Sequence, residues 1–228
     1  MEDISRFAIY YAPRPGAFAD MAAAWLGWDA LGGNAVAHPV VAGLRLPLAD
    51  ITAEPARYGF HGTLRAPFRA AEGVSLTEVA DTVAALAARL APVVCKGLRL
   101  EDLDGFLALT PLGCEAELLE LAAQVVSGSD HLRAPLSAAE VARRRPETLT
   151  GRQRALLDQW GYPFVMEEFR FHLTLTGKLG EGQAGPVAAV IDGLFAPVMP
   201  RPFVIEDLCL FGEADGRFRA LHRYPLTG

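Results

Sequence analysis

The sequence predicts an α+β protein with two pseudo-symmetric lobes, each an antiparallel sheet with helices packed on its outer face, and a groove between the lobes. The order strand, helix, hairpin occurs twice along the chain, and an Asp-Gly dipeptide, a typical hairpin signal, separates the last two strands of each half. The strands alternate apolar and polar residues, as antiparallel strands with one solvated face do. We expect one two-lobed domain over residues 1–228, with lobe one at about 1–114, a helical connector at about 115–160 and lobe two at about 161–228.

Local residue patterns predict the strands and helices of the first lobe. Residues 6–12 are rich in aromatic and β-branched side chains and stop at Pro13, which predicts a strand and a turn. Ser75 and Glu78 fit a capping box that opens an alanine-rich helix. The expected elements are a strand at 6–12, a helix at about 17–26, mostly loop at 32–56, a strand at 57–68, a helix from 75 to about 90, and hairpin strands at 98–102 and 106–110.

The connector and the second lobe follow the same rules. The pattern from residue 115 to about 160 is helical, with breaks expected at Gly128, Pro135 and Pro146. The elements expected after it are a strand at 169–178, a Gly-rich turn, a helix at about 186–195, and strands at 203–211 and 217–224.

The bulk composition limits the classes of function. Of the 228 residues, 51% are hydrophobic and 21% are charged, as in an ordinary folded domain. The net charge of -6 argues against a long nucleic-acid surface, which needs clustered Lys and Arg, but allows a small phosphorylated substrate held by a few arginines. No apolar stripe demands a second subunit, so we expect a monomer.

The cysteines and the N-terminus predict a reduced, cytoplasmic protein. The three cysteines lack the close paired spacings of zinc ribbons and redox motifs. The chain begins with acidic residues and enters a strand-like segment, unlike a signal peptide. No apolar run approaches the roughly 18 residues of a membrane span, so we expect no membrane contact.

A His followed two residues later by Thr occurs in both central strands. The pairs are His61 with Thr63 and His172 with Thr174. Because successive strand side chains point to opposite faces, each His must share a face with its Thr. A solvated polar face is the bland explanation of one such pair. Two pairs in corresponding places, in a chain with only five histidines, favour a functional role.

The side chains beside these motifs are candidates for binding. By the same parity, Arg65 and Arg170 fall on the polar faces, where a guanidinium would anchor a phosphate. Tyr10 is expected to line the groove, because Phe7 and Ile9 resemble the buried face of the first strand, although a buried tyrosine fits equally well.

Two imidazoles and two hydroxyls on one groove suit the cleavage of a phosphodiester. A neutral imidazole takes a proton from the attacking water or hydroxyl, and a protonated one gives a proton to the leaving oxygen. Each Thr hydroxyl can donate to a phosphate oxygen where negative charge grows. We therefore expect His61 and His172 as the catalytic pair and Thr63 and Thr174 as substrate-binding residues, with no metal and no cofactor. Which His is the acid stays open, because the two motifs have the same local chemistry.

These motifs resemble those of the two-histidine (2H) phosphoesterase superfamily. They are most similar to the branch encoded in bacterial phosphonate-utilisation gene clusters. The segments that carry the resemblance are residues 7–13, 25–28, 58–64 and 171–175. Gly62 departs from the Ala of that pattern, but it lies on the apolar face and leaves the chemistry untouched.

The resemblance implies an active-site groove between the lobes, metal-free catalysis and a cyclic phosphate or nucleotide-like phosphodiester as substrate. Members of the superfamily act on RNA ends with 2′,3′-cyclic phosphates or on small sugar cyclic phosphates. The branch points to a ribose cyclic phosphate from phosphonate breakdown. Other members only bind nucleotides, so a non-catalytic nucleotide- or phosphate-binding module is the alternative.

Several other signals compete with this interpretation. Residues 180–185 fit the pattern G-x-G-x-x-G, but the strand before them alternates instead of being continuously apolar, so a flexible turn is expected there. A metal site at His61 and His172 would lack a carboxylate on their faces, save Glu168, and would leave the threonines unexplained.

Three further histidines and one run of arginines lie outside the two motifs. His38 and His131 are expected at the surface. His222 lies on the last predicted strand, where it has two possible positions, one that reaches the groove and one outside it. The run Arg143–Arg145 is either a solvated helix end or a gate for an anionic substrate.

Overall fold

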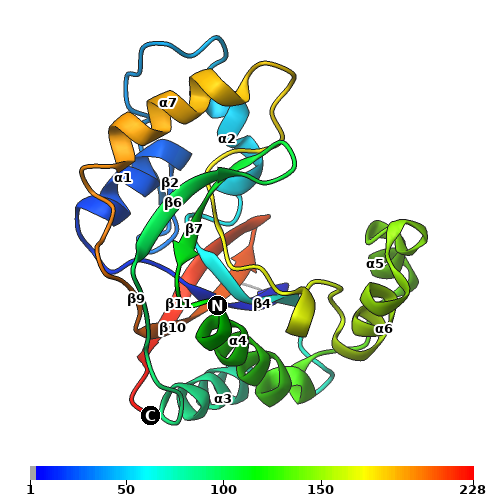
Figure 1. Ribbon diagram of the computed structural model, residues 1–228. Coiled ribbons are helices and arrows are strands. Elements are labelled where there is room, and N and C mark those ends of the chain that lie inside the picture. The colour runs from blue at the N-terminus through cyan, green and yellow to red at the C-terminus, as the bar shows by residue number, and fades with distance from the viewer. Residues whose placement is uncertain (1–3) are drawn as a thin grey trace.

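A seven-stranded antiparallel sheet forms the centre of the computed structural model, which describes residues 4–228 (Figure 1). The strand order is β11-β10-β1-β4-β8-β7-β6. The bounds are β1 Arg6–Tyr11, β4 Gly62–Phe68, β6 Gly97–Asp102, β7 Leu107–Leu112, β8 Leu173–Thr174, β10 Asp207–Ala214 and β11 Arg217–Pro225. Short strands pair outside this sheet: β2 Trp28–Asp29 with β3 Asn34–Ala35, and β5 Val93–Cys95 with β9 Phe203–Ile205.

The two motif strands, β4 and β8, are neighbours at the middle of the sheet. They pair at Gly62 opposite Leu173. The sheet therefore has two halves that meet between the motifs, β11-β10-β1-β4 and β8-β7-β6. The α+β class with antiparallel strands is confirmed, and the two expected sheets are the halves of one continuous sheet.

Each hairpin lies in the half of the sheet opposite to the one that its place in the sequence suggests. We expected the β6–β7 hairpin to complete the lobe of the first motif, but it pairs with β8, where Ala108 faces Thr174. The N-terminal β1 and the C-terminal β10 pair instead, with Ile9 opposite Leu210. Because β4 has β1 on one side and β8 on the other, it has no free edge for the hairpin. Both ends of the sequence thus build one half, and the expected ranges 1–114 and 161–228 do not coincide with the strand pairing.

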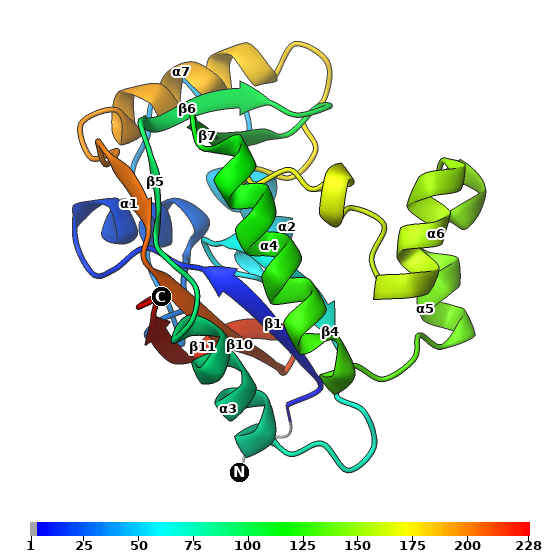
Figure 2. The same ribbon diagram turned by 60° about the horizontal axis from the view of Figure 1, so that its bottom comes forward.

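The helices cover one face of the sheet and leave the other to the motif side chains. Phe7 and Ile9 of β1 belong to one buried cluster with residues of the main helices, including Leu118 and Ile191. The bounds are α1 Ala17–Leu26, α2 Leu48–Ala56, α3 Leu76–Ala87, α4 Glu115–Ser129, α5 Ala138–Arg143, α6 Gly151–Trp160 and α7 Ala184–Phe195. In both views α3 and α4 lie together near one half, α1 and α7 lie near the other, and α5 and α6 stand apart at the side (Figures 1 and 2).

Most of the predicted helices are confirmed. Helix α1 has the expected bounds, and Nε1 of its Trp25 donates to the carbonyl of Leu175 at 2.8 Å, which ties α1 to the chain after the second motif. The N-cap of α3 is Ser75, whose Oγ accepts from the Glu78 amide at 3.2 Å. The expectation of loop up to residue 56 was wrong, because α2 forms there around Pro55 without a side-chain cap that would signal it.

Both motif strands are shorter than expected. We predicted strands at 57–68 and 169–178, but β4 begins at Gly62 and β8 spans only Leu173–Thr174. Gly59, before β4, has a φ of 72°, which turns the backbone out of an extended conformation. Strand parity therefore applies over a shorter range than the alternation suggests.

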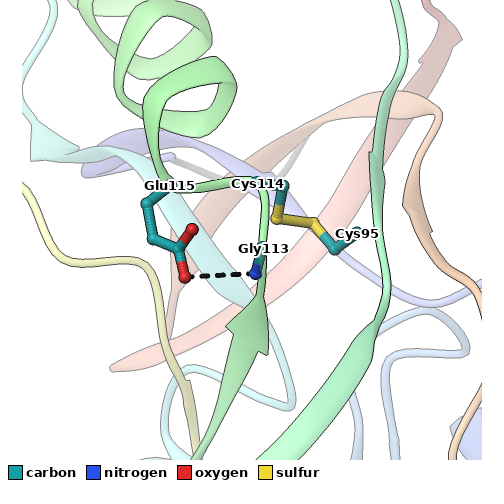
Figure 3. Close-up of a disulfide and its surroundings, with 4 residues drawn as sticks. All are labelled: Cys95, Gly113, Cys114 and Glu115. Atoms are coloured by element: carbon teal, nitrogen blue, oxygen red, sulfur yellow. Dashed lines mark hydrogen bonds between the residues drawn. A yellow bond between two sulfur atoms is a disulfide. The ribbon is translucent and has the colours of Figure 1, made fainter.

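Cys95 and Cys114 form a disulfide (Figure 3). This corrects the expectation of three reduced cysteines; Cys209 is free and buried. The hairpin explains the pairing, since Gly97 lies opposite Leu112 and each cysteine lies two residues beyond its member of that pair. Their Cα atoms are 5.0 Å apart, within the range that a disulfide requires. The bond joins β5 to the start of α4.

Over residues 4–228, no helix combines the length and the apolar character needed to cross a membrane.

Candidate active site

The ring of His61 is fixed by the turn that precedes β4. Its Nδ1 lies 2.8 Å from the carbonyl oxygen of Gly59. A carbonyl oxygen only accepts, so Nδ1 carries the hydrogen and Nε2 of the neutral ring holds the lone pair. Nε2 lies 3.1 Å from Oγ1 of Thr63, which donates to it. A side chain at Gly59 would place its Cβ 2.3 Å from that of Ala30, so glycine is required for this turn.

The ring of Tyr10 packs against the ring of His61. The two rings are stacked, with centroids 3.8 Å apart and planes 26° apart. Tyr10 is fully buried, and its hydroxyl has no hydrogen-bond partner among the described residues. Of the two alternatives for Tyr10, the structure shows the buried tyrosine: it belongs to the residues around the cavity, but it is fully buried and His61 covers its ring face.

His172 has the same backbone bond but different neighbours. Its Nδ1 donates to the carbonyl of Arg170 at 2.8 Å, two residues back, as His61 does to Gly59. The ring faces Phe106 at a centroid distance of 5.7 Å. Among the described residues, no hydroxyl donates to its Nε2.

Burial favours the neutral form of both imidazoles. It lowers the pKa of His61 to about 4, against the opposing effect of the Gly59 carbonyl; the nearby His172 lowers it slightly further. Burial also lowers the pKa of His172, again against its backbone hydrogen bond. Both rings are thus available as proton acceptors near neutral pH.

One cavity of about 700 Å³ contains both motifs. His61, Thr63, His172 and Thr174 all line it. The short β4–β8 pairing brings them together, because it places the two motifs side by side on one face of the sheet. These four predicted site residues therefore converge on one space.

The two predicted arginines do not converge in the same way. Arg65 lines the cavity but is only 3% exposed, and it donates to the Val126 carbonyl and, at 2.9 Å, to Asp130. It holds α4 against β4. Arg170 is exposed and lies outside the cavity, because the chain is not yet a strand there and parity does not apply.

A further wall of the cavity was not predicted from the sequence. It is formed by residues 137–168 with α5 and α6, here called the arm, and Arg143, Arg144, Trp160 and Tyr162 of the arm line the cavity. The Arg143–Arg145 run was expected to be either a solvated helix end or a gate for an anionic substrate. Arg143 and Arg144 line the cavity, whereas Arg145 does not. The only sequence feature that pointed to these two arginines was the run of three consecutive arginines. His222 is exposed on β11 and lies outside the cavity.

The cavity is basic although the whole chain is acidic. Eight Arg and Lys side chains line it against two carboxylates, Glu54 and Glu140. This local excess suits an anionic ligand. Within residues 4–228, no group of three or more His, Cys, Asp and Glu side chains is arranged to hold a metal ion.

The fold and the site define an α+β protein with a basic cavity that holds two His-x-Thr motifs. The chain belongs to the family described as "Protein of unknown function (DUF1045)", whose model matches residues 63–219. It is 37% identical over its whole length to a ribose 1,5-bisphosphate phosphokinase PhnN of Janthinobacterium sp. (strain Marseille), and 40% identical over 92% of its length to the protein of that name from Laribacter hongkongensis. It covers 52% and 48% of those proteins, so it spans about half the length of the curated relatives it matches.

Solved structures of low sequence identity show partial similarity. The protein TT0787 of Thermus thermophilus aligns with a TM-score of 0.47 at 15% identity, covering 98% of each chain. LigT of E. coli in complex with NADP+ aligns with a TM-score of 0.46 at 16% identity, covering 99% of each chain.

Proposed function

We propose that this protein is a metal-independent 2H-type phosphoesterase that hydrolyses a cyclic phosphodiester of a small sugar phosphate or nucleotide. The observation that carries the proposal is the placement of two imidazoles, each beside a Thr, in one basic cavity. An acid, a base and hydroxyl donors around one phosphate are the groups that this hydrolysis requires.

The differences between the motifs assign the two roles. His61 is the general base, because its pKa of about 4 keeps Nε2 unprotonated and this Nε2 accepts from a hydroxyl, whereas no hydroxyl among the described residues donates to that of His172. A phosphate oxygen that accepts the Thr63 hydroxyl frees Nε2 to take a proton from water. His172 is the general acid. A bound phosphate raises its pKa, since an opposite charge favours the imidazolium.

Atoms and protons balance in this hydrolysis. The water oxygen forms a bond to phosphorus, and one bond from phosphorus to a ring oxygen of the cyclic diester breaks. The proton from water goes to His61, and the proton of His172 goes to the leaving oxygen. The product is a phosphomonoester beside a free hydroxyl, and proton exchange with solvent restores both histidines.

The curated relatives support a ribose phosphate as substrate. Their name includes ribose 1,5-bisphosphate, and this chain matches about half of their length. Hydrolysis of a ribose 1,2-cyclic phosphate at O2, on a sugar that carries a 5-phosphate, yields ribose 1,5-bisphosphate. We assign the kinase step to the other half of those relatives, because the 228 residues contain no Gly-x-x-x-x-Gly-Lys-Ser/Thr phosphate loop.

The phosphonate context is part of the same proposal. It is supported by the resemblance to the branch encoded in phosphonate-utilisation clusters. We propose the cytoplasm as the compartment, since a phosphorylated sugar does not cross an apolar bilayer unaided. The Cys95–Cys114 bond argues for an oxidising compartment instead, so counting free thiols in protein rapidly alkylated in cells tests this part.

The experiment is a hydrolysis screen in the presence of a chelator. Ribose 1,2-cyclic phosphates and nucleoside 2′,3′-cyclic phosphates are offered to the wild type and to the double variant His61→Ala/His172→Ala. We expect chelator-resistant turnover by the wild type and none by the variant. Loss of turnover with chelator and its return with a divalent metal would overturn the metal-free mechanism. Binding without turnover would identify a phosphate-binding module instead.

A further inference from the structure

The arm contributes two neighbouring cations that the proposed reaction does not use. Arg143 is the last residue of α5, and Arg144 is its C-cap. Both line the cavity that holds the two histidines. Neither belongs to an ion pair among the described residues, unlike Arg6 and Arg69, which line the same cavity and pair with Glu213 and Glu140.

The nearest carboxylate on α5 is already committed. Glu140 accepts from Nε and Nη2 of Arg69 at 3.0 and 2.9 Å, and from the backbone and hydroxyl of Ser137. These bonds lower the pKa of Glu140 to about 2, with the Arg69 hydrogen bond as the largest cause. Glu140 therefore joins the arm to the chain after β4 and leaves the two arginines without an anion.

Aromatic packing holds Arg144 in place. Its guanidinium carbon lies 4.8 Å from the centroid of the Tyr162 ring. Stacking on a ring orients the planar guanidinium and leaves its edge N–H groups for a ligand. Tyr162 is partly buried, and the arm is anchored to α4 by Val165 and Leu156, which pack with Val126. Arg144 is thus held at the cavity by a part of the arm that packs firmly against α4.

The arm reaches the cavity from the side of His61. Burial raises the pKa values of Tyr10 and Tyr162, and two smaller effects show that these tyrosines are neighbours: Tyr162 raises the pKa of Tyr10 further, and Tyr58 raises that of Tyr162 further. Tyr10 is the residue stacked under His61. An anion held by Arg143 and Arg144 would therefore lie on the side of the cavity where Tyr162, Tyr10 and His61 are neighbours.

We propose that Arg143 and Arg144 form a second phosphate subsite, which binds a phosphomonoester on the same molecule whose cyclic phosphodiester reaches His61 and His172. This rests on the proposed function for the identity of the first group. A phosphomonoester dianion matches two adjacent guanidinium groups in charge and in donor geometry. The substrate class is then a sugar carrying both a cyclic phosphate and a separate terminal phosphate.

The test compares two substrates that differ only in the second phosphate. These are ribose 1,2-cyclic phosphate and its 5-phosphorylated form, measured with the wild type and with Arg143→Gln/Arg144→Gln. The wild type should prefer the phosphorylated form in kcat/KM. The double variant should lower that preference by about 10- to 100-fold, as expected when charge-assisted hydrogen bonds are lost.

Arg145→Gln is the matched control, because Arg145 adjoins the pair in sequence but does not line the cavity. It should leave the preference unchanged. An equal loss in this control would mean that only the general positive field matters and would overturn the subsite. An unchanged preference in the double variant would overturn it as well.

Calorimetry with ribose 5-phosphate separates this proposal from the proposed function. If neither cyclic phosphate is hydrolysed, tighter binding of ribose 5-phosphate to the wild type and to Arg145→Gln than to the double variant still supports the subsite. Equal binding to all three proteins would overturn the subsite, whatever the turnover.

Discussion

The two His-x-Thr motifs begin from the same residues but lie in different surroundings. His61 lies on the buried ring of Tyr10 and accepts from Thr63, while His172 faces Phe106 and has no hydroxyl on its Nε2 among the described residues. The carbonyl bound by His61 comes from a glycine with positive φ, whereas that of His172 comes from Arg170. A doubled motif therefore need not give two equal groups.

The largest effects should come from the histidines themselves. His61→Ala and His172→Ala should each lower kcat on a cyclic phosphate by about 10² to 10⁴, since each removes one proton transfer. The double variant should lose little more than the worse single variant, because the two groups act in one step. Steady-state kinetics on variants with wild-type circular dichroism checks this. A full product of the two single losses would indicate independent roles.

The pH dependence of kcat/KM should report the two histidines separately. The base must be neutral, so kcat/KM should rise with pH through about 4, the pKa of His61. The acid must be protonated, so kcat/KM should fall as pH rises through the pKa of His172, which burial lowers from 6.5. The maximum should therefore lie below pH 6.5.

Thr63→Val and Thr174→Val should each lower kcat/KM by about 10², the usual loss for one donor to a developing charge. Thr63→Val should also move the acidic limb to higher pH, because the hydroxyl that stabilises neutral His61 is gone. Thr174→Val should leave that limb in place. Equal pH profiles in the two variants would count against the assigned roles.

Gly62 is the point where the motif strands approach each other. A Cβ there would lie 2.1 Å from Cζ of Phe171, so Gly62→Ala must displace the buried Phe171 ring or the backbone at the start of β4. A displacement of about 1 Å can cost about 10² in rate, and we expect a 10- to 100-fold loss in kcat. The departure from Ala at this position is thus tied to the close contact with Phe171. Gly193→Ala, which meets no atom within 4 Å, is the control and should keep full activity.

Tyr10→Phe should have the smallest effect. The ring under His61 is kept, and the removed hydroxyl is buried without a partner among the described residues, so the free energy of unfolding should rise or stay unchanged. We expect kcat within about threefold of wild type, since the hydroxyl makes no bond in the described site. Thermal unfolding and kinetics measure both. A loss of about 10² would show that the hydroxyl contacts the substrate.

The sequence was sufficient where local periodicity decides the structure. Alternation placed His61 and Thr63 on one face, and both line the cavity although His61 immediately precedes β4. Alternation failed at Arg170, because β8 is too short to include it. Arg65 was placed on the correct face, but its charge is used by Asp130, 65 residues away, which no local pattern reveals.

Long-range pairing explains the other differences. The exchange of hairpins depends on which strand edges are free, and this is a property of the whole sheet. The arm residues reach the cavity through packing against α4, so their side chains carry no periodic signal. The disulfide is an intermediate case, because the hairpin register at Gly97 and Leu112 already places Cys95 opposite Cys114.

The division of roles between the motifs is tested most directly with a cyclic substrate whose leaving oxygen is replaced by sulfur. A thiolate leaves without protonation far more readily than an alkoxide, since a thiol has a pKa of about 8.5. We predict that His172→Ala regains most of the wild-type rate on the sulfur substrate while His61→Ala does not. Recovery by His61→Ala, or equal recovery by both variants, would contradict the assigned roles.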